Sequence, residues 1–193
     1  MNRHSYLTAL LIMFALVLLT GCMDLRIELT VDKNGNPSEL SIRASSDERL
    51  FINMAANQFV EWYDTIRQDG HDAYVFLEID DTSPPYSATM TFDYSEARRR
   101  GFSSVHGLWE VMDVESDDDS IVVSYDFGVQ DEPSDSGDMS HLISMTIVTS
   151  MPGEVETYSG GFLDRTRRVH TYRGNLAEPI TYSVSSKKPG LWR

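Results

Sequence analysis

Apolar and polar residues alternate along several short stretches of the chain, which is the pattern of half-buried β-strands. The alternation is complete in residues 24–32, and Lys33-Asn34-Gly35-Asn36 has the composition of a hairpin turn. Seven further stretches read as strands: residues 38–44, 73–80, 86–94, 120–129, 142–151, 169–172 and 180–185. The sequence therefore predicts about eight strands, most of them joined by turns too short for a crossover helix.

One long helix is predicted after the second strand. Apolar residues recur every three or four positions from Phe51 to Ile66, which places them on one broad stripe. Ser45 and Glu48 have the spacing of a capping box at its start, and Gly70 would end it. Shorter helical turns are predicted in residues 95–101 and 103–112. The predicted fold class is α+β: a largely antiparallel sheet of about eight strands packed on one long helix, with one or two short helices.

The N-terminal residues have the organisation of a lipoprotein signal peptide. Arg3 precedes an apolar run over residues 7–19, which ends in a Leu-Thr-Gly-Cys lipobox whose Cys22 is the only cysteine in the chain. Cleavage before an acylated Cys22 would divide the chain into a signal peptide, a single envelope domain and a short basic tail: residues 1–21, 22–186 and 187–193. The alternative is an uncleaved membrane-spanning helix, since no charge lies between Ser5 and Met23.

The charge of the chain limits its partners. There are 30 acidic and 16 basic residues, and the formal net charge is −14. Such a surface repels nucleic acid and anionic headgroups, so we expect the lipid anchor to supply the attachment to the extracytoplasmic side of the cell membrane. The run from Arg98 to Arg100 is predicted to be solvated, or to contact lipid phosphate or an acidic loop. Four tail residues are predicted to rest at the membrane interface or to belong to a disordered tail: Lys187, Lys188, Trp192 and Arg193.

The sequence lacks the motifs of catalysis and metal binding. Histidines stand at positions 4, 71, 106, 141 and 170, and none has a second ligand at the spacing of a zinc motif. The chain has no Gly-x-Ser-x-Gly elbow and no phosphate-binding glycine loop. We therefore predict that the protein is not an enzyme and has neither a metal site nor a cofactor.

Large, deformable apolar side chains are the candidate ligand-binding groups. Methionine and aromatic residues adapt to acyl chains of variable shape better than branched aliphatic residues do. The predicted ligand-binding residues are Phe51, Met54, Phe59, Trp62, Tyr63, Met90, Phe92 and Met145. Two interpretations stay open, because the same side chains would either line a cavity between the helix and the concave face of the sheet or simply fill the core.

Several short motifs resemble the LppM family of actinobacterial envelope lipoproteins. They are the run CMDLRIELTV from Cys22, the segment from Phe102 to Trp109, the strand at 120–127, and IVTSMPGEV at 147–155. The resemblance implies an α+β domain related to lipid-binding folds, outside the cytoplasmic membrane, that binds phosphatidylinositol-type glycolipids. Family members usually carry a transmembrane helix after the domain, whereas this chain ends at Arg193, and no ligand residues can be transferred to the predicted long helix.

These features lead to one functional prediction and one alternative. The chain is predicted to be a membrane-anchored envelope lipoprotein whose extracytoplasmic domain binds an acyl chain of a phospholipid or glycolipid. The alternative is a non-enzymatic interaction or structural module of the cell envelope with a filled core.

Overall fold

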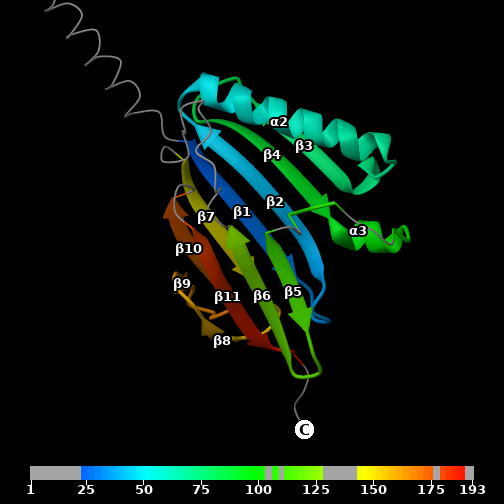
Figure 1. Cartoon of the computed structure of the whole chain (residues 1–193), viewed down its shortest axis with the longest axis vertical. Helices are drawn as coiled ribbons and strands as arrows, with labels where there is room; N and C mark the ends of the chain where they lie inside the picture. Colours follow the sequence, from blue (N-terminus) through cyan, green and yellow to red (C-terminus); the bar gives the residue numbers. More distant parts are fainter. Residues whose placement is uncertain (1–22, 103–105, 109–110, 128–142, 176–178, 190–193) are drawn as a thin grey trace, which may run out of the picture.

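The computed structural model describes residues 23–102, 106–108, 111–127, 143–175 and 179–189. The strands of these residues form two sheets, one of seven strands and one of four (Figure 1). The two α-helices of the described residues are α2 (Arg49–Gln68) and α3 (Tyr94–Arg99), and a short 3₁₀ helix, η1, spans Asp72–Tyr74. None of the described helices is long and apolar enough to span a membrane.

The large sheet has the strand order β3-β4-β2-β1-β7-β10-β9. Its strands are β1 (Met23–Val31), β2 (Pro37–Ser46), β3 (Val75–Asp80), β4 (Tyr86–Asp93), β7 (Ile143–Ser150), β9 (Phe162–Leu163) and β10 (Val169–Asn175). Neighbouring strands run antiparallel except for the central pair, β1 and β7, which are parallel. The first strand of the domain therefore lies in the middle of the sheet and is paired on both edges.

The small sheet has the order β5-β6-β11-β8 and is antiparallel throughout. Its strands are β5 (Met112–Ser116), β6 (Ser120–Phe127), β8 (Val155–Tyr158) and β11 (Ile180–Lys187). Val123 of β6 and Val184 of β11 are fully buried in the same apolar cluster as Ile27 of β1 and Ile147 of β7. The main core thus lies between the inner faces of the two sheets.

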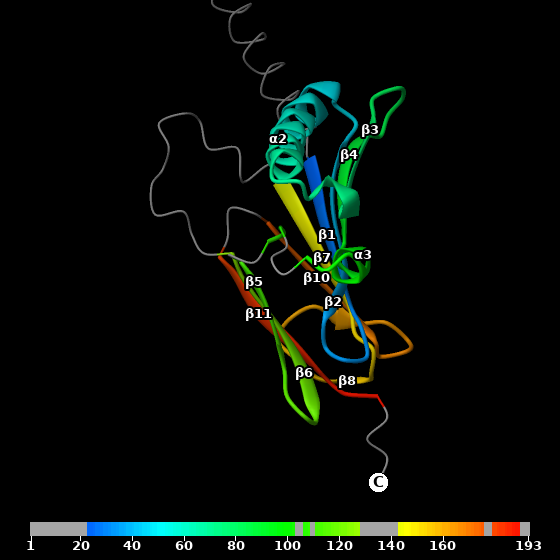
Figure 2. The same ribbon diagram turned by 90° about the vertical axis from the view of Figure 1, so that its right-hand side faces the viewer.

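Helix α2 and the small sheet lie side by side on the same face of the large sheet (Figure 2). The helix packs against β2, β3 and β4. The small sheet covers the rest of that face. Strand alternation on the opposite face points polar residues such as Arg26, Arg43 and Thr89 toward solvent.

The predicted fold class is wrong. In place of one sheet of about eight strands on a long helix, the structure has sheets of seven and four strands, and α2 covers only part of the larger one. Strand β5 was not predicted, and β8 and β9 lie around Gly160-Gly161, where the sequence predicts only a polar hairpin region. The cause is physical: alternation marks a strand face that is buried, but it does not distinguish cover by a helix from cover by a second sheet.

The local signals at turns and helix ends differ in outcome. The hairpin at Asn34-Gly35 is confirmed, since Gly35 has a φ of 85° and Asp32 N–H donates to the Asn36 carbonyl at 2.8 Å. The helix end is confirmed by the φ of 78° at Gly70. The capping box is wrong, because Ser45 pairs with β4 as part of β2 and the helix starts only at Arg49. Strand pairing has overridden the local cap.

The chain passes from the large sheet to the small one at Gly153, between β7 and β8. A Cβ atom at this position would lie 2.1 Å from the carbonyl oxygen of Lys187 at the end of β11. Only glycine permits so close an approach of two backbone segments. The residue therefore fixes the corner at which the chain changes sheets.

Candidate functional site

Three of the predicted ligand-binding residues lie in the centre of the core. Met90 and Phe92 are 0% exposed and Met145 is 1% exposed. Met90 and Phe92 come from β4, whereas Met145 comes from β7, and all three belong to the main apolar cluster. The structure brings them into one core without placing any of them on the surface.

The predicted residues on α2 are more accessible. Phe59, Trp62 and Tyr63 are half-buried and pack against the main cluster. The rings of Trp62 and Phe92 are 5.2 Å apart between centroids. Trp62 therefore packs on Phe92 from the helix side, and no part of the Phe92 side chain is exposed.

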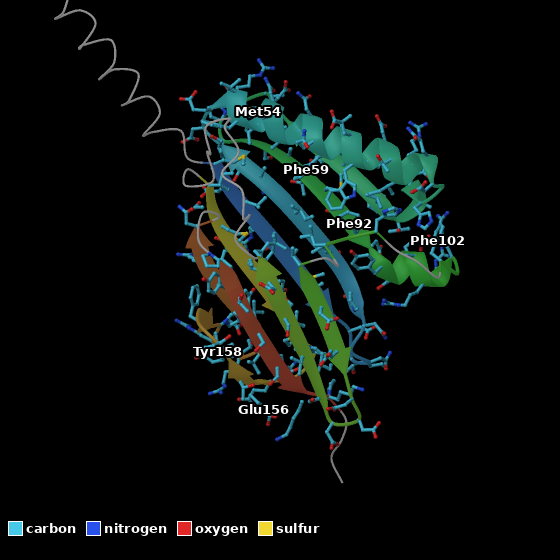
Figure 3. The ribbon with its side chains drawn as sticks, in the orientation of Figure 1. Met54, Phe59, Phe92, Phe102, Glu156 and Tyr158 are labelled. Atoms are coloured by element: carbon cyan, nitrogen blue, oxygen red, sulfur yellow. The ribbon has the colours of Figure 1, made fainter. Side chains whose placement is uncertain are left out.

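Phe51 and Met54 lie near the start of α2. Phe51 is half-buried and Met54 is 50% exposed. Figure 3 shows Met54 at this end of the helix and Phe59 farther along it. The predicted set therefore divides into a buried core, a half-buried helix stripe and one exposed methionine.

One end of the fold gathers exposed apolar side chains, and we call it the Met23 end. Strand register places the start of β1 there, because Asp24 pairs with Ser45, Ser45 with Ser87, and Ser87 with Asp80. The first turn of α2 lies at the same end, where Arg49 bonds Asp81 at 2.5 Å. The exposed apolar residues at this end are Leu50 (67%), Met54 (50%) and Ile79 (43%).

Small side chains pack beneath this surface. A separate apolar cluster joins Ala44, Ala88, Ala56 and Ile52, with Met23 half-buried at its edge. Ile52 and Ala56 face the sheet from the first half of α2, and the alanines let the helix approach closely. Leu50 and Met54 stand two residues away from these inward positions, on the opposite side of the helix, and project into solvent.

Acidic residues surround the exposed apolar groups. They are Asp24, Asp47, Glu48, Asp80 and Asp81. Hydrogen bonds from Thr82 lower the pKa of Asp80, so that carboxylate stays charged in mildly acidic solution. A surface of this kind suits neutral or zwitterionic lipid better than anionic lipid.

A cluster of polar and aromatic groups joins the end of α2 to the segment after α3. The imidazole rings of His71 and His106 are 5.1 Å apart, and His106 Nε2 lies 3.6 Å from a carboxylate oxygen of Asp69. The Tyr74 hydroxyl accepts the His106 backbone N–H at 3.0 Å. The sequence did not reveal this pair, because 35 residues separate the two histidines, as 106 − 71.

We expect His106 to make stability depend on pH between 7 and 5. Burial lowers the pKa of His106, nearby His71 lowers it further, and Asp69 acts in the opposite direction. The unfolded chain therefore binds more protons here than the folded protein does, so the stabilisation present above about pH 6.5 is lost as pH falls through the folded pKa. Urea unfolding at the two pH values should show a larger loss in the wild type than in His106→Gln, by less than about 1 kcal/mol because the site is partly exposed. Equal losses in both proteins would contradict this assignment.

The basic run at Arg98 to Arg100 is occupied by intramolecular contacts. Arg98 bonds Asp32 at 3.2 Å, whereas Arg99 and Arg100 each bond Glu96 at 2.6 Å. These two guanidinium groups lower the pKa of Glu96 to about 2. Of the three interpretations of this run, the structure favours contacts with acidic residues.

The remaining predictions concern the lipidated cysteine, the C-terminal tail and metal binding. Cys22, Trp192 and Arg193 lie outside the described residues. Lys187 ends β11, and it lies with Lys188 at the opposite end of the fold from Met23. Their contact with a membrane interface stays a prediction. Among the described residues, no group of three or more histidine or acidic side chains is placed to hold a metal ion.

Comparison with known proteins finds a similar solved structure but no matching family. No protein-family model matches the chain, and no curated protein sequence matches it. The chain is similar to the NMR structure of the folded domain of Mycobacterium tuberculosis LppM, with 10% sequence identity and a TM-score of 0.49, over 87% of this chain and 91% of that one. At this level the likeness carries no argument about function, and membership of the LppM family stays a prediction.

Proposed function

We propose that the protein is a lipid-anchored lipoprotein on the extracytoplasmic side of the cell membrane, and that its Met23 end contacts lipid acyl chains. One observation carries the proposal. Strand β1 begins at Met23, directly after the lipobox cysteine, and Leu50, Met54 and Ile79 are exposed at the same end.

No flexible linker separates Cys22 from the first strand of the domain, and this limits how far the domain can lie from the membrane. One residue spans at most about 3.6 Å, so a domain whose first strand starts at Met23 is held close to an acylated Cys22. Full burial of a leucine, isoleucine or methionine side chain contributes about 1.5–3 kcal/mol. Three such side chains, even partly inserted, would add useful affinity to a single anchor.

The first turns of α2 extend this apolar surface. Phe51 is half-buried three residues before exposed Met54, on the same side of the helix, and the two form an apolar flank. A chain bound there would not need to enter the core. Contact between this flank and one acyl chain of a phospholipid or glycolipid is the lipid-binding activity that we propose.

The second candidate function is a non-enzymatic interaction module with a filled core. The complete burial of Met90, Phe92 and Met145 favours it, because these groups are satisfied by protein contacts. The exposed residues at the Met23 end would then meet another envelope protein in place of lipid. The two candidates differ in what touches Met54.

Site-specific photocrosslinking separates the two candidates in the full-length protein in cell membranes. A photoreactive amino acid at Met54 should form adducts with phospholipid or glycolipid. The matched control is Tyr158, which is similarly exposed at 46% but lies on β8 (Figure 3), and it should form no lipid adducts. Cys22→Ser should abolish both acylation and cleavage before position 22, so labelling with a clickable fatty acid should be lost and the chain should keep residues 1–21.

Two outcomes would contradict the proposal. If position 54 crosslinked to protein while position 158 behaved as before, the interaction module would be the better account. If Cys22→Ser remained processed and membrane-bound, the lipid anchor itself would be disproved.

A further inference from the structure

A charged groove of about 900 Å³ lies at the opposite end of the fold from Met23. It is formed by β8 with the three residues before it, the end of β11 with the two residues after it, the residues that precede β10, and the turn between β5 and β6. Strand register places it at this end, since Lys187 pairs with Ser120 and Ser116 at the end of β5 meets the Gly35 turn that follows β1. Its charged lining residues are Asp119, Glu154, Glu156, Arg167, Arg168, Lys187 and Lys188.

Basic groups outnumber acidic groups in the groove by four to three, although the whole chain has 30 acids and 16 bases. Two of the four basic groups are paired, Arg167 with Glu154 at 2.8 Å and Lys187 with Glu156 at 2.5 Å. Arg168 and Lys188 have no carboxylate within 4.0 Å among the described residues. Lys188 is nevertheless near Asp117, whose pKa is lowered by hydrogen bonds from Ser120 and Asp119 and further by the charge of Lys188. The groove therefore holds one cationic group away from carboxylates, Arg168, and a second, Lys188, outside direct ion-pair distance.

The backbone next to Arg168 is held in an unusual conformation. Arg167 has a φ of 54°, in the left-handed region that glycine occupies at lower cost. The carboxylate of Asp164 maintains this turn by accepting the backbone N–H groups of Arg168 and Val169, both at 3.1 Å. The Arg167 carbonyl also accepts the Val155 backbone N–H at 2.7 Å, so this turn fixes the backbone of Arg167 and Arg168 beside β8.

We propose that this groove binds phosphoryl groups of a molecule on the side of the protein away from the membrane. A guanidinium fork matches two phosphate oxygens, and a lysine ammonium adds a compact charge, so Arg168 and Lys188 supply complementary contacts. The paired groups Arg167 and Lys187 flank them and can turn from their surface ion pairs at little cost. The net negative charge of the chain does not prevent binding, because charges beyond about 8 Å are screened at physiological ionic strength.

The position of the groove selects the source of the phosphate. It lies at the end of the domain away from Met23, so headgroups of the membrane that holds the anchor are out of reach in the proposed orientation. A soluble or wall-bound phosphate compound is therefore the expected ligand. The source of the phosphate thus rests on the proposed function, whereas binding of phosphate in the groove does not depend on acylation of Cys22.

Pyrophosphate is the probe for the test, titrated by calorimetry into the full-length protein in detergent micelles. The double variant Arg168→Gln/Lys188→Gln should weaken binding by about tenfold or more, as expected for the loss of two charged contacts. Glu154→Gln should tighten binding by about threefold, because it releases Arg167 from its ion pair. Arg173→Gln is the matched control, since Arg173 lies over the Phe162 ring on β10 and β9, outside the groove, and it should leave the affinity unchanged.

A second arm identifies the source of the phosphate. The full-length protein is placed in phosphatidylcholine vesicles with and without phosphatidylinositol 4-phosphate. Equal pyrophosphate affinity in both vesicles supports a ligand away from the membrane, whereas weaker affinity with the phosphoinositide would show that headgroups of the same membrane fill the groove and would overturn the proposal. No saturable binding of pyrophosphate in micelles, or equal weakening by Arg173→Gln, would also overturn it. Neither arm measures acyl contacts at Met54, so this proposal and the proposed function can fail separately.

Discussion

Phe92→Ala should lower the free energy of unfolding by about 3–5 kcal/mol, the usual cost of deleting a fully buried phenylalanine ring. Phe92 is 0% exposed and pairs with Leu40 on one side and Val75 on the other. Its ring also lies 5.2 Å from that of Trp62 and 6.0 Å from that of Tyr94, between centroids. The surrounding strands cannot close around the missing ring, so a cavity would remain.

Urea unfolding followed by tryptophan fluorescence measures this loss. The matched control is Phe76→Ala on the neighbouring strand β3, because Phe76 is 57% exposed and should change stability by no more than about 0.5 kcal/mol. A loss below about 1 kcal/mol for Phe92→Ala, together with altered lipid occupancy in native mass spectrometry, would instead show that the ring lines a ligand cavity.

Gly153→Ala should destabilise the protein by about 3 kcal/mol, the upper end of the cost of overpacking. The added methyl group would lie 2.1 Å from the Lys187 carbonyl oxygen, which belongs to the backbone and cannot rotate away. Relief requires the corner before β8 to move from the end of β11. The change would therefore loosen the small sheet at its edge strand.

Gly70→Ala is the matched control for this corner. Gly70 has a φ of 78°, but a Cβ atom there would meet nothing within 4 Å. Its substitution tests backbone conformation alone and should cost about 1 kcal/mol. Urea unfolding of both variants gives the comparison, and similar losses for both would show that the corner at Gly153 can adjust to a methyl group.

The sequence predicted the parts of the fold that depend on neighbouring residues. Gly35 and Gly70 mark a turn and a helix end because positive φ is a local property. Ser45 misled the prediction of the helix start, because strand pairing with Ser87 is formed by a segment more than forty residues away. The division of the strands into two sheets could not be predicted for the same reason. Alternation shows that a segment is a strand, but it does not show which other strand it pairs with.

The candidate sites also depend on contacts between segments that are distant in the sequence. Apolar patterning identified Met90 and Phe92 as inward-facing, but the choice between core and cavity depends on the ring of Trp62, which the fold brings to them. The groove combines charges from four separate segments, and in an acidic chain no single pair such as Lys187-Lys188 indicates it. Sites of this kind become visible only when the tertiary contacts are known.

The parallel pairing of β1 with β7 has a consequence for the order of folding. Met23 pairs with Ile143, a separation of 143 − 23 = 120 residues. At a synthesis rate of roughly 5–20 residues per second, β1 waits about 6–24 s for this partner after it has itself emerged. In that interval β2 can cover one edge of β1, but the other edge presents unpaired backbone and Leu25, Ile27 and Leu29 to any passing chain. The nascent protein is thus most exposed to misassembly at its own first strand, and chaperone protection would matter most there.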